Sequence, residues 1–147
     1  MQKSERLVGS VSSLIQVVLD TNFLTVPSEF GVDIFQESER LLERRIEFVV
    51  LDSVLAELDV KASKAKGAIE GRKFRVAKDL AKRCKLIDTT HFEEKKSVDE
   101  RLLEYTESVG GVLATNDRDL KQKARSLGLP VLILRAKKKL SLEGAVI

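Results

Sequence analysis

Short, uninterrupted runs of apolar and often β-branched residues recur along the chain, and this pattern constrains the fold more than any other feature. The runs cover residues 17–19, 48–51, 86–87, 112–114 and 131–134. Each is apolar at consecutive positions, as required of a strand that is covered on both faces. Because helical patterns separate the runs, the sequence predicts an α/β fold, a three-layer α/β/α sandwich with a central, mostly parallel sheet.

Helix start signals stand between these runs. Ser97 and Glu100 predict a capping box that opens a helix over residues 98–109. Asn116 or Thr115 is expected to cap the last helix, which follows the fourth run. No repeat or linker interrupts the chain, so we expect residues 15–147 to form one domain with a basic C-terminal tail, preceded by an extension over residues 1–14 to which we assign no role.

The number of cysteines and the hydropathy of the chain indicate in which cellular compartment the protein is expected. Cys84 is the only cysteine among the 147 residues, so no internal disulfide can form and the chain fits a reducing environment. Nowhere do about 18 apolar residues run together, as a membrane-spanning helix would require. We therefore expect a cytoplasmic protein with no membrane partner.

Basic residues are concentrated in one segment. Residues 61–85 contain ten lysines and arginines against Glu70 and Asp79, whereas the formal net charge of the whole chain is only +3. A basic segment joined to a more acidic body suits a polyanion held beside carboxylates. The alternative is an ordinary solvated helix face, and the composition alone does not choose between them.

Acidic residues fall where the predicted strands end. Asp20 directly follows the first run, Asp117 follows the fourth, and Glu57 lies early in the helix after the second. Ligands of open parallel sheets bind beyond the carboxyl ends of the strands. Asp99, in the first turn of a predicted helix, is placed less directly. Spacing alone does not favour Glu57 over Asp59.

Carboxylates that gather at one edge raise one another's pKa unless a cation lies between them. Oxygen ligands with room for water suit Mg²⁺ or Mn²⁺, and such ions activate water for phosphodiester hydrolysis. Each acid also has an ordinary explanation. Asp20 could end a strand in a turn, Asp99 could favour a helix N-terminus, and Asp119 could support a helix cap at Asn116.

A resemblance to the PIN-domain nucleases rests on four segments in this order: VVLDTNF, DSVLAEL, SVDERLLEY and VLATNDRDL, which span roughly residues 17–134. The resemblance implies an endoribonuclease that leaves 5′-phosphate and 3′-hydroxyl ends with Mg²⁺ or Mn²⁺. It implies that Asp20, Glu57, Asp99 and Asp117 are catalytic metal ligands and that Asp119 is an accessory ligand. Asn22 and Thr115 would orient the acids or the metal-bound water.

Within this family, LDTNFLTVPSEFGVDIF and LPVLILRAKKKLSLEG resemble most the archaeal branch related to the PIN endonucleases of eukaryotic small-subunit ribosomal RNA processing. Precursor ribosomal RNA is then the expected substrate, with a ribosome-assembly partner. Two alternatives stay open: a toxin-type PIN ribonuclease paired with an antitoxin, and a non-catalytic RNA-binding assembly module. A homodimer is expected by resemblance to other PIN proteins.

The RNA contacts implied by this reading are basic and aromatic. Base stacking would use Phe74, Phe92 or Tyr105, since the chain has one tyrosine and no tryptophan. The predicted phosphate contacts are Lys61, Lys64, Lys66, Arg72, Lys73, Arg75, Lys78, Lys82, Lys137 and Lys138.

Overall fold

The centre of the sheet forms where the chain is apolar at consecutive positions. The computed structural model describes residues 14–91 and 96–146, so residues 1–13 of the predicted extension lie outside the described part. Strands β1 (Ile15–Leu19) and β4 (Val112–Ala114) pair in parallel, and every residue of β4 is fully buried. Burial of consecutive residues confirms that helices cover the strands on both faces.

The sheet has six strands in the order β3, β2, β1, β4, β5, β6. The outer strands are β2 (Ile46–Leu51), β3 (Lys85–Ile87), β5 (Val131–Arg135) and β6 (Lys139–Glu143). All neighbours from β3 to β5 are parallel, which confirms the predicted sheet, and β6 is antiparallel to β5. The chain first builds outward from β1 to β3 and then returns to add β4 on the other side of β1, so the strand order reverses between β1 and β4.

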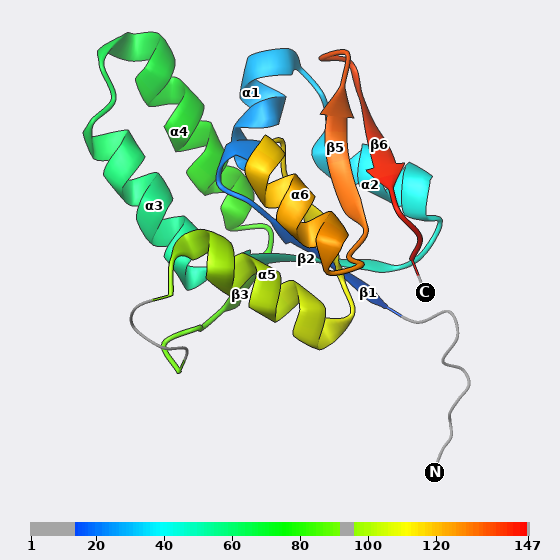
Figure 1. Ribbon diagram of the computed structural model, residues 1–147. Coiled ribbons are helices and arrows are strands. Elements are labelled where there is room, and N and C mark those ends of the chain that lie inside the picture. Colours follow the sequence, from blue (N-terminus) through cyan, green and yellow to red (C-terminus); the bar gives the residue numbers. More distant parts are fainter. Residues whose placement is uncertain (1–13, 92–95, 147) are drawn as a thin grey trace.

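Helices cover both faces of this sheet (Figure 1). In that view α5 (Val98–Val109) and α6 (Arg118–Ser126) lie in front of the sheet and α2 (Ile34–Leu42) lies behind it. α3 (Asp52–Ser63) and α4 (Gly67–Ala81) form a helical hairpin that connects β2 to β3. The predicted three-layer architecture is confirmed. Within the described ranges, no helix combines the length and the apolar character that crossing a membrane would need.

The predicted capping box of α5 is confirmed. The hydroxyl of Ser97 accepts a hydrogen bond from the backbone N–H of Glu100 at 3.1 Å, and Oε1 of Glu100 accepts one from the N–H of Ser97 at 2.9 Å. Two free N–H groups at the helix start are satisfied in this way, which fixes where α5 begins. The first turn of α5, which contains Asp99, is placed by this local interaction.

Two short helices that the sequence did not predict follow β1, η2 (Asn22–Thr25) and α1 (Val26–Phe30). They are too short to produce a helical repeat of apolar residues. Pro27 occupies the first turn of α1, where its missing N–H has no cost, and Gly31 ends the helix with a φ of +67°. These turns direct the chain away from the sheet immediately after Asp20.

The predicted basic C-terminal tail is partly wrong, because the chain forms strand β6 there. Leu140 and Leu142 alternate with polar residues and pack on the core, which is the pattern of a strand with one buried face. The turn between β5 and β6 has positive φ at Ala136 and Lys137. Such a turn normally carries asparagine or glycine, and their absence hides the hairpin in the sequence.

A glycine allows the two central strands to approach closely. A Cβ atom at Gly111, just before β4, would lie 2.7 Å from the backbone oxygen of Gln16 in β1. Any other residue would therefore push β4 away from β1. The close pairing of β1 and β4 matters because the carboxyl ends of both strands lead into acidic residues.

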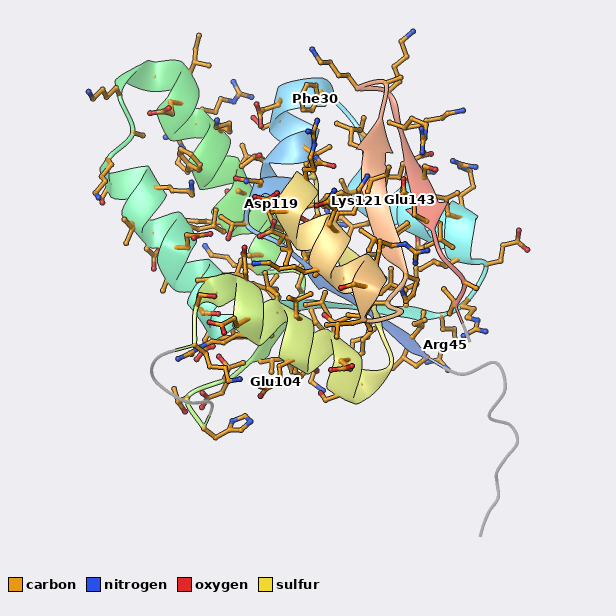
Figure 2. All side chains as sticks on the ribbon, in the orientation of Figure 1. Phe30, Arg45, Glu104, Asp119, Lys121 and Glu143 are labelled. Atoms are coloured by element: carbon orange, nitrogen blue, oxygen red, sulfur yellow. The ribbon has the colours of Figure 1, made fainter. Side chains whose placement is uncertain are left out.

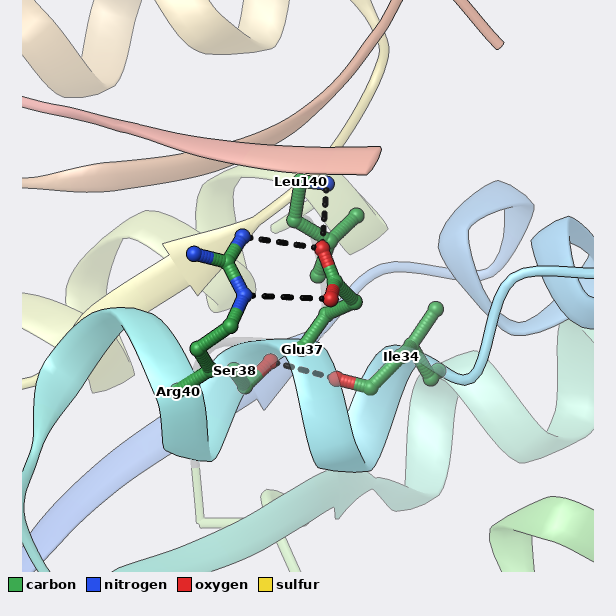
Figure 3. A network of polar contacts seen from close by, with 5 residues as sticks. All are labelled: Ile34, Glu37, Ser38, Arg40 and Leu140. Atoms are coloured by element: carbon green, nitrogen blue, oxygen red, sulfur yellow. Dashed lines mark hydrogen bonds and ion pairs between the residues drawn. The ribbon is translucent and has the colours of Figure 1, made fainter. Parts of the chain in front are cut away.

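The outer edge of β6 is bound by Glu37 of α2 (Figure 3). Oε1 of Glu37 accepts hydrogen bonds from the backbone N–H of Leu140 at 3.2 Å and from Nη2 of Arg40 at 3.1 Å, and Oε2 accepts one from Nε of Arg40. The hydrogen bond from Arg40 lowers the pKa of Glu37. A backbone group of an edge strand, which the sheet itself leaves unpaired, thus has a charged partner.

Glu37→Ala removes this partner, and we expect it to lower the free energy of unfolding by about 1–2 kcal/mol, because a hydrogen bond to a charged group is lost. Amide exchange of Leu140 should become faster. Glu39→Ala, an exposed change on the same helix, is the control. Equal loss of stability in the two variants, measured by chemical denaturation, would contradict a specific role for Glu37.

Candidate functional site

Two of the predicted acids follow the strands between which the strand order reverses. Asp20 comes directly after β1, and Asp117 lies three positions after β4. The backbone N–H of Asp20 donates to the oxygen of Ala114 at 3.0 Å, which joins the two strand ends. Connections leave such a point in opposite directions, so a crevice forms beyond the strand ends.

Asp20 is buried, with 6% of its surface exposed. Its Oδ1 accepts a hydrogen bond from the N–H of Thr21 and its Oδ2 accepts one from the hydroxyl of Thr115, both at 2.7 Å. Burial raises the pKa of Asp20 to about 6; the two hydrogen bonds oppose this, and the negative charges of Asp99 and Glu57 add to it. The carboxylate forms no salt bridge within the described residues.

Thr115 links Asp20 to Asp117. Its fully buried hydroxyl donates to Asp20 and accepts a hydrogen bond from the backbone N–H of Asp117 at 3.0 Å. Oδ1 of Asp117 in turn accepts from the N–H of Leu120 at 2.9 Å and caps α6. Thr115 therefore contacts both acids, and its orienting role stays a prediction.

The sequence prediction of the α6 cap was wrong. Asp117 is the cap, one position later than Asn116 and two later than Thr115. Oδ1 of Asn116 accepts instead from the backbone N–H of Leu134 at 2.9 Å, which ties the loop to β5. Thr115, Asn116 and Asp117 are all polar residues of a kind that can cap a helix. Because β5 lies next to the loop, Asn116 bonds to β5 and Asp117 caps α6.

Asp99 joins the same group of charges. It lies half-buried in the first turn of α5, and burial is the main cause that raises its pKa. The charge of Asp117 is the next cause, Glu57 and Asp119 contribute further, and Lys123 opposes them. Figure 2 shows Asp119 in the first turn of α6. The charges of Glu57, Asp117 and Asp119 therefore all act on Asp99, and those of Glu57 and Asp99 act on Asp20.

The structure separates Glu57 from Asp59, which spacing alone could not do. Glu57 acts on the pKa of both Asp20 and Asp99. Asp59 instead forms an ion pair with Lys78 of α4, at 2.8 Å. Of these two acids of α3, Glu57 is therefore the one whose charge acts on the other carboxylates of the site.

Asn22 does not hold Asp20, contrary to one of its expected roles. It begins η2 with an exposed side chain, and the hydrogen bonds to Asp20 come from Thr21 and Thr115. Sequence reasoning also missed Lys123, whose charge acts on Asp99. The available signal was its spacing of four residues from Asp119 on one helix face.

The donor set fits a hydrated divalent cation. The ligands of the cation would be carboxylate oxygens. The buried hydroxyl of Thr21, next to Asp20, has no hydrogen-bond partner within the described residues and could bond to a water bound to the cation. In residues 14–91 and 96–146, no three Asp, Glu, His or Cys side chains are close enough to hold an ion directly. Mg²⁺ commonly binds through one or two carboxylates and keeps several waters, so a fully formed cage is not required.

The predicted phosphate contacts lie in two regions, the α3–α4 hairpin and the turn between β5 and β6. Lys61 is in α3, Lys64 and Lys66 are in the turn after it, Arg72, Lys73, Arg75 and Lys78 are in α4, and Lys82 follows α4. Lys137 and Lys138 lie in the β5–β6 turn. Since β5 is parallel to the central strands, that turn is at the same edge of the sheet as Asp20. Lys78 is already occupied by Asp59, so the basic residues are not equally free.

A groove of about 460 Å³ between α3 and α4 connects acidic and basic residues. Its lining consists of Glu57, Val60, Lys61, Lys64, Glu70 and Phe74. Glu57 therefore belongs both to the acidic group and to a groove with two of the predicted phosphate contacts. The groove therefore places Glu57 beside the positive charges of Lys61 and Lys64.

Aromatic stacking finds little support. Phe74 is buried at 8% exposure, with the Lys73 ammonium 4.9 Å from its ring centroid. The hydroxyl of Tyr105 donates to Gln16 of β1. Phe92, the third expected stacking residue, lies outside the described residues. Because Phe74 is buried and Tyr105 is bonded to β1, neither ring presents much of an open face on which an RNA base could stack.

Known proteins resemble this chain in sequence and in fold. The PIN like domain family model matches residues 17–137. Ribonuclease VapC4 of Methanocaldococcus jannaschii is 33% identical over 140 residues, which cover 90% of this chain and all of that protein.

Two solved structures superpose on the chain. The PIN domain endonuclease Utp24 matches with a TM-score of 0.70 and 26% identity, over 89% of this chain and 92% of that one. A domain of a Methanocaldococcus jannaschii protein of unknown function shares the fold, with a TM-score of 0.58 and 14% identity over 90% and 98% of the two chains. On the family match and the identity to VapC4, the chain belongs to the PIN-like domain family.

Proposed function

We propose that this protein is an endoribonuclease that uses Mg²⁺ or Mn²⁺ to hydrolyse RNA phosphodiester bonds. The observation that carries the proposal is the position of Glu57. Its charge raises the pKa of the buried Asp20, and its side chain also lines the groove that contains Lys61 and Lys64. RNA phosphates held by the two lysines would lie beside the carboxylates. VapC4 is named a ribonuclease and Utp24 an endonuclease, which supports the same chemistry.

In the proposed reaction, different residues bind the cation, orient its ligands and bind the RNA. Asp20, Glu57, Asp99 and Asp117 would hold the cation, with Asp119 as an accessory ligand. When bound, the cation supplies an activated water for attack on phosphorus and neutralises charge on the phosphate. Thr115 keeps Asp20 in a fixed orientation, and burial of Asp20 keeps competing water away. The basic residues hold the RNA backbone with little sequence information.

We propose processing of ribosomal RNA precursors as the biological role, since two long segments resemble that branch of the family. Utp24 also matches with 26% identity. A toxin-type role is the second candidate, and the 33% identity to VapC4 favours it. A short reading frame for an antitoxin directly upstream of the gene would support the toxin role. Selective cutting of precursor ribosomal RNA would support the processing role.

Asp20→Asn should abolish cleavage while leaving RNA binding within about twofold, because the change removes a cation ligand and not a phosphate contact. The measurement is cleavage of labelled precursor ribosomal RNA fragments and tRNAs with Mg²⁺, Mn²⁺ or EDTA, together with binding by anisotropy. Asp33→Asn, at the cap of α2 and outside the group of charges that act on Asp20 and Asp99, is the matched control. Cutting that survives in Asp20→Asn would contradict the assigned role.

The raised pKa of Asp20 predicts a pH-dependent stability difference. Because the folded protein holds this proton up to a pKa of about 6 instead of 3.8, ionisation of Asp20 destabilises the metal-free fold as the pH rises through that window. In EDTA, Asp20→Asn should match wild type near pH 4 and exceed its free energy of unfolding by up to about 3 kcal/mol above pH 6. Mn²⁺ should stabilise wild type more than the variant. A difference that does not change with pH would contradict the burial argument.

Lys61→Ala combined with Lys64→Ala should weaken RNA binding and reduce the slope of log K against log salt by about 1.4, since each contact to single-stranded RNA releases roughly 0.7 counterion. Arg44→Ala combined with Arg45→Ala, at the amino end of β2, removes equal charge from the opposite edge of the sheet. The same slope change in both variants would show that net charge, and not this groove, binds RNA.

A further inference from the structure

A second pocket shares Glu57 with the acidic site. It has a volume of about 530 Å³ and lies between α3 and α5, where Ser53, Ala56, Glu57 and Val60 face Val98 and Arg101. The α3 residues are spaced by three and four and so belong to one helix face. The volume lies in the range of pockets that hold small ligands, and a single nucleotide is of that size.

The pocket walls offer apolar contact. Ala56, Val60 and Val98 contribute aliphatic surface, and Val60 is 51% exposed. The charged side chain of Lys96, which also lines the pocket, forms an ion pair with Glu104 at 3.0 Å. A flat apolar group with a polar edge would suit these walls better than a second phosphate would.

Arg101 is held in place before any ligand arrives. Its Nη1 donates to the hydroxyl of Thr89 at 3.1 Å and to the backbone oxygen of Thr89 at 3.4 Å. Thr89 is itself fully buried and donates from both its hydroxyl and its N–H to Oδ1 of Asp52. Only one of the three guanidinium nitrogens takes part in these bonds. A fixed guanidinium plane is a surface on which an RNA base can stack.

Ser53 supplies a free hydrogen-bonding group. Its hydroxyl oxygen is buried and has no partner in the described part of the chain. A buried hydroxyl without a partner lowers stability, so such groups usually have a partner in the functional state. Because the oxygen is covered, the Ser53 side chain would have to rotate about χ1 to turn it toward a ligand in the pocket that this residue lines.

We propose that this pocket binds one unpaired nucleobase of the RNA, adjacent to the phosphate that is cleaved. The proposal rests on the endoribonuclease function, because Glu57 is what places the pocket next to the cleavage site. The base lies against the aliphatic walls and the Arg101 plane and bonds to Ser53. A paired base would first have to leave its stack, so the substrate is cut within a single-stranded segment.

The test combines pocket variants with RNA that lacks single bases. Ala56→Trp fills the pocket from an exposed position, and Ala68→Trp, exposed at the start of α4, is the matched control. Each protein is assayed with Mn²⁺ on one single-stranded RNA and on versions with an abasic nucleotide at each position around the cut. Wild type and Ala68→Trp should lose about tenfold or more in kcat/KM when one particular base is missing. Ala56→Trp should lose a similar factor on intact RNA and almost nothing further on the abasic RNA.

Ser53→Ala provides a second variant that avoids steric effects. It should lower kcat/KM by about fivefold while the melting temperature stays equal or rises, because it removes an unpaired buried hydroxyl. A structural role for Ser53 would instead lower the melting temperature.

The possible failures are distinguishable. If cleavage is lost in Asp20→Asn, yet no abasic position matters and Ala56→Trp cuts as well as Ala68→Trp, the pocket proposal is overturned and the nuclease stands. Equal cutting of duplex and single-stranded RNA would also overturn it. If no cleavage depends on Asp20, the proposed function fails and the pocket proposal fails with it.

Discussion

The burial of Asp20 between the ends of β1 and β4 is the constraint on which the rest of the site depends. The two central strands place this carboxylate beyond the sheet, and Thr21 and Thr115 hold both of its oxygens. Because burial and the charges of Asp99 and Glu57 oppose its ionisation, the fold carries a cost that a cation would offset. In the proposed function, the cost of ionising Asp20 in the empty site and the affinity of the site for a cation would have the same cause.

Each acid around Asp20 is placed by a different local device. The capping box starts α5 at the position that brings Asp99 into the group, and Asp117 caps α6 with the oxygen that bonds Leu120. The position of Glu57 depends on the direction in which α3 leaves the end of β2. Since α3 also faces α4 and α5, this single helix connects the acidic group to the Lys61–Lys64 groove and to the pocket beside Arg101. In the proposed function, the cation ligand and the contacts to RNA would therefore share one helix.

Local patterns predicted much of the fold. Uninterrupted apolar runs identified five strands, and Ser97 with Glu100 located α5. The failures have physical reasons. Strand β6 follows a turn of Ala136 and Lys137 that carries no turn residues, while η2 and α1 are shorter than the repeat that reveals a helix. Asn116 looked like a helix cap because its competing partner, the N–H of Leu134, is 18 residues away.

By itself the sequence determined the five strands from β1 to β5, the order of the acids along the chain and the family they resemble, because these depend on neighbours within a few residues. Only the tertiary structure decided that Glu57 and not Asp59 faces Asp20, that Thr115 and not Asn22 holds it, and that Arg101 and Ser53 border a pocket beside it. These outcomes depend on how helices cross and which hydroxyl a buried carboxylate meets. Contacts between residues far apart in the chain leave no local pattern from which they could be read.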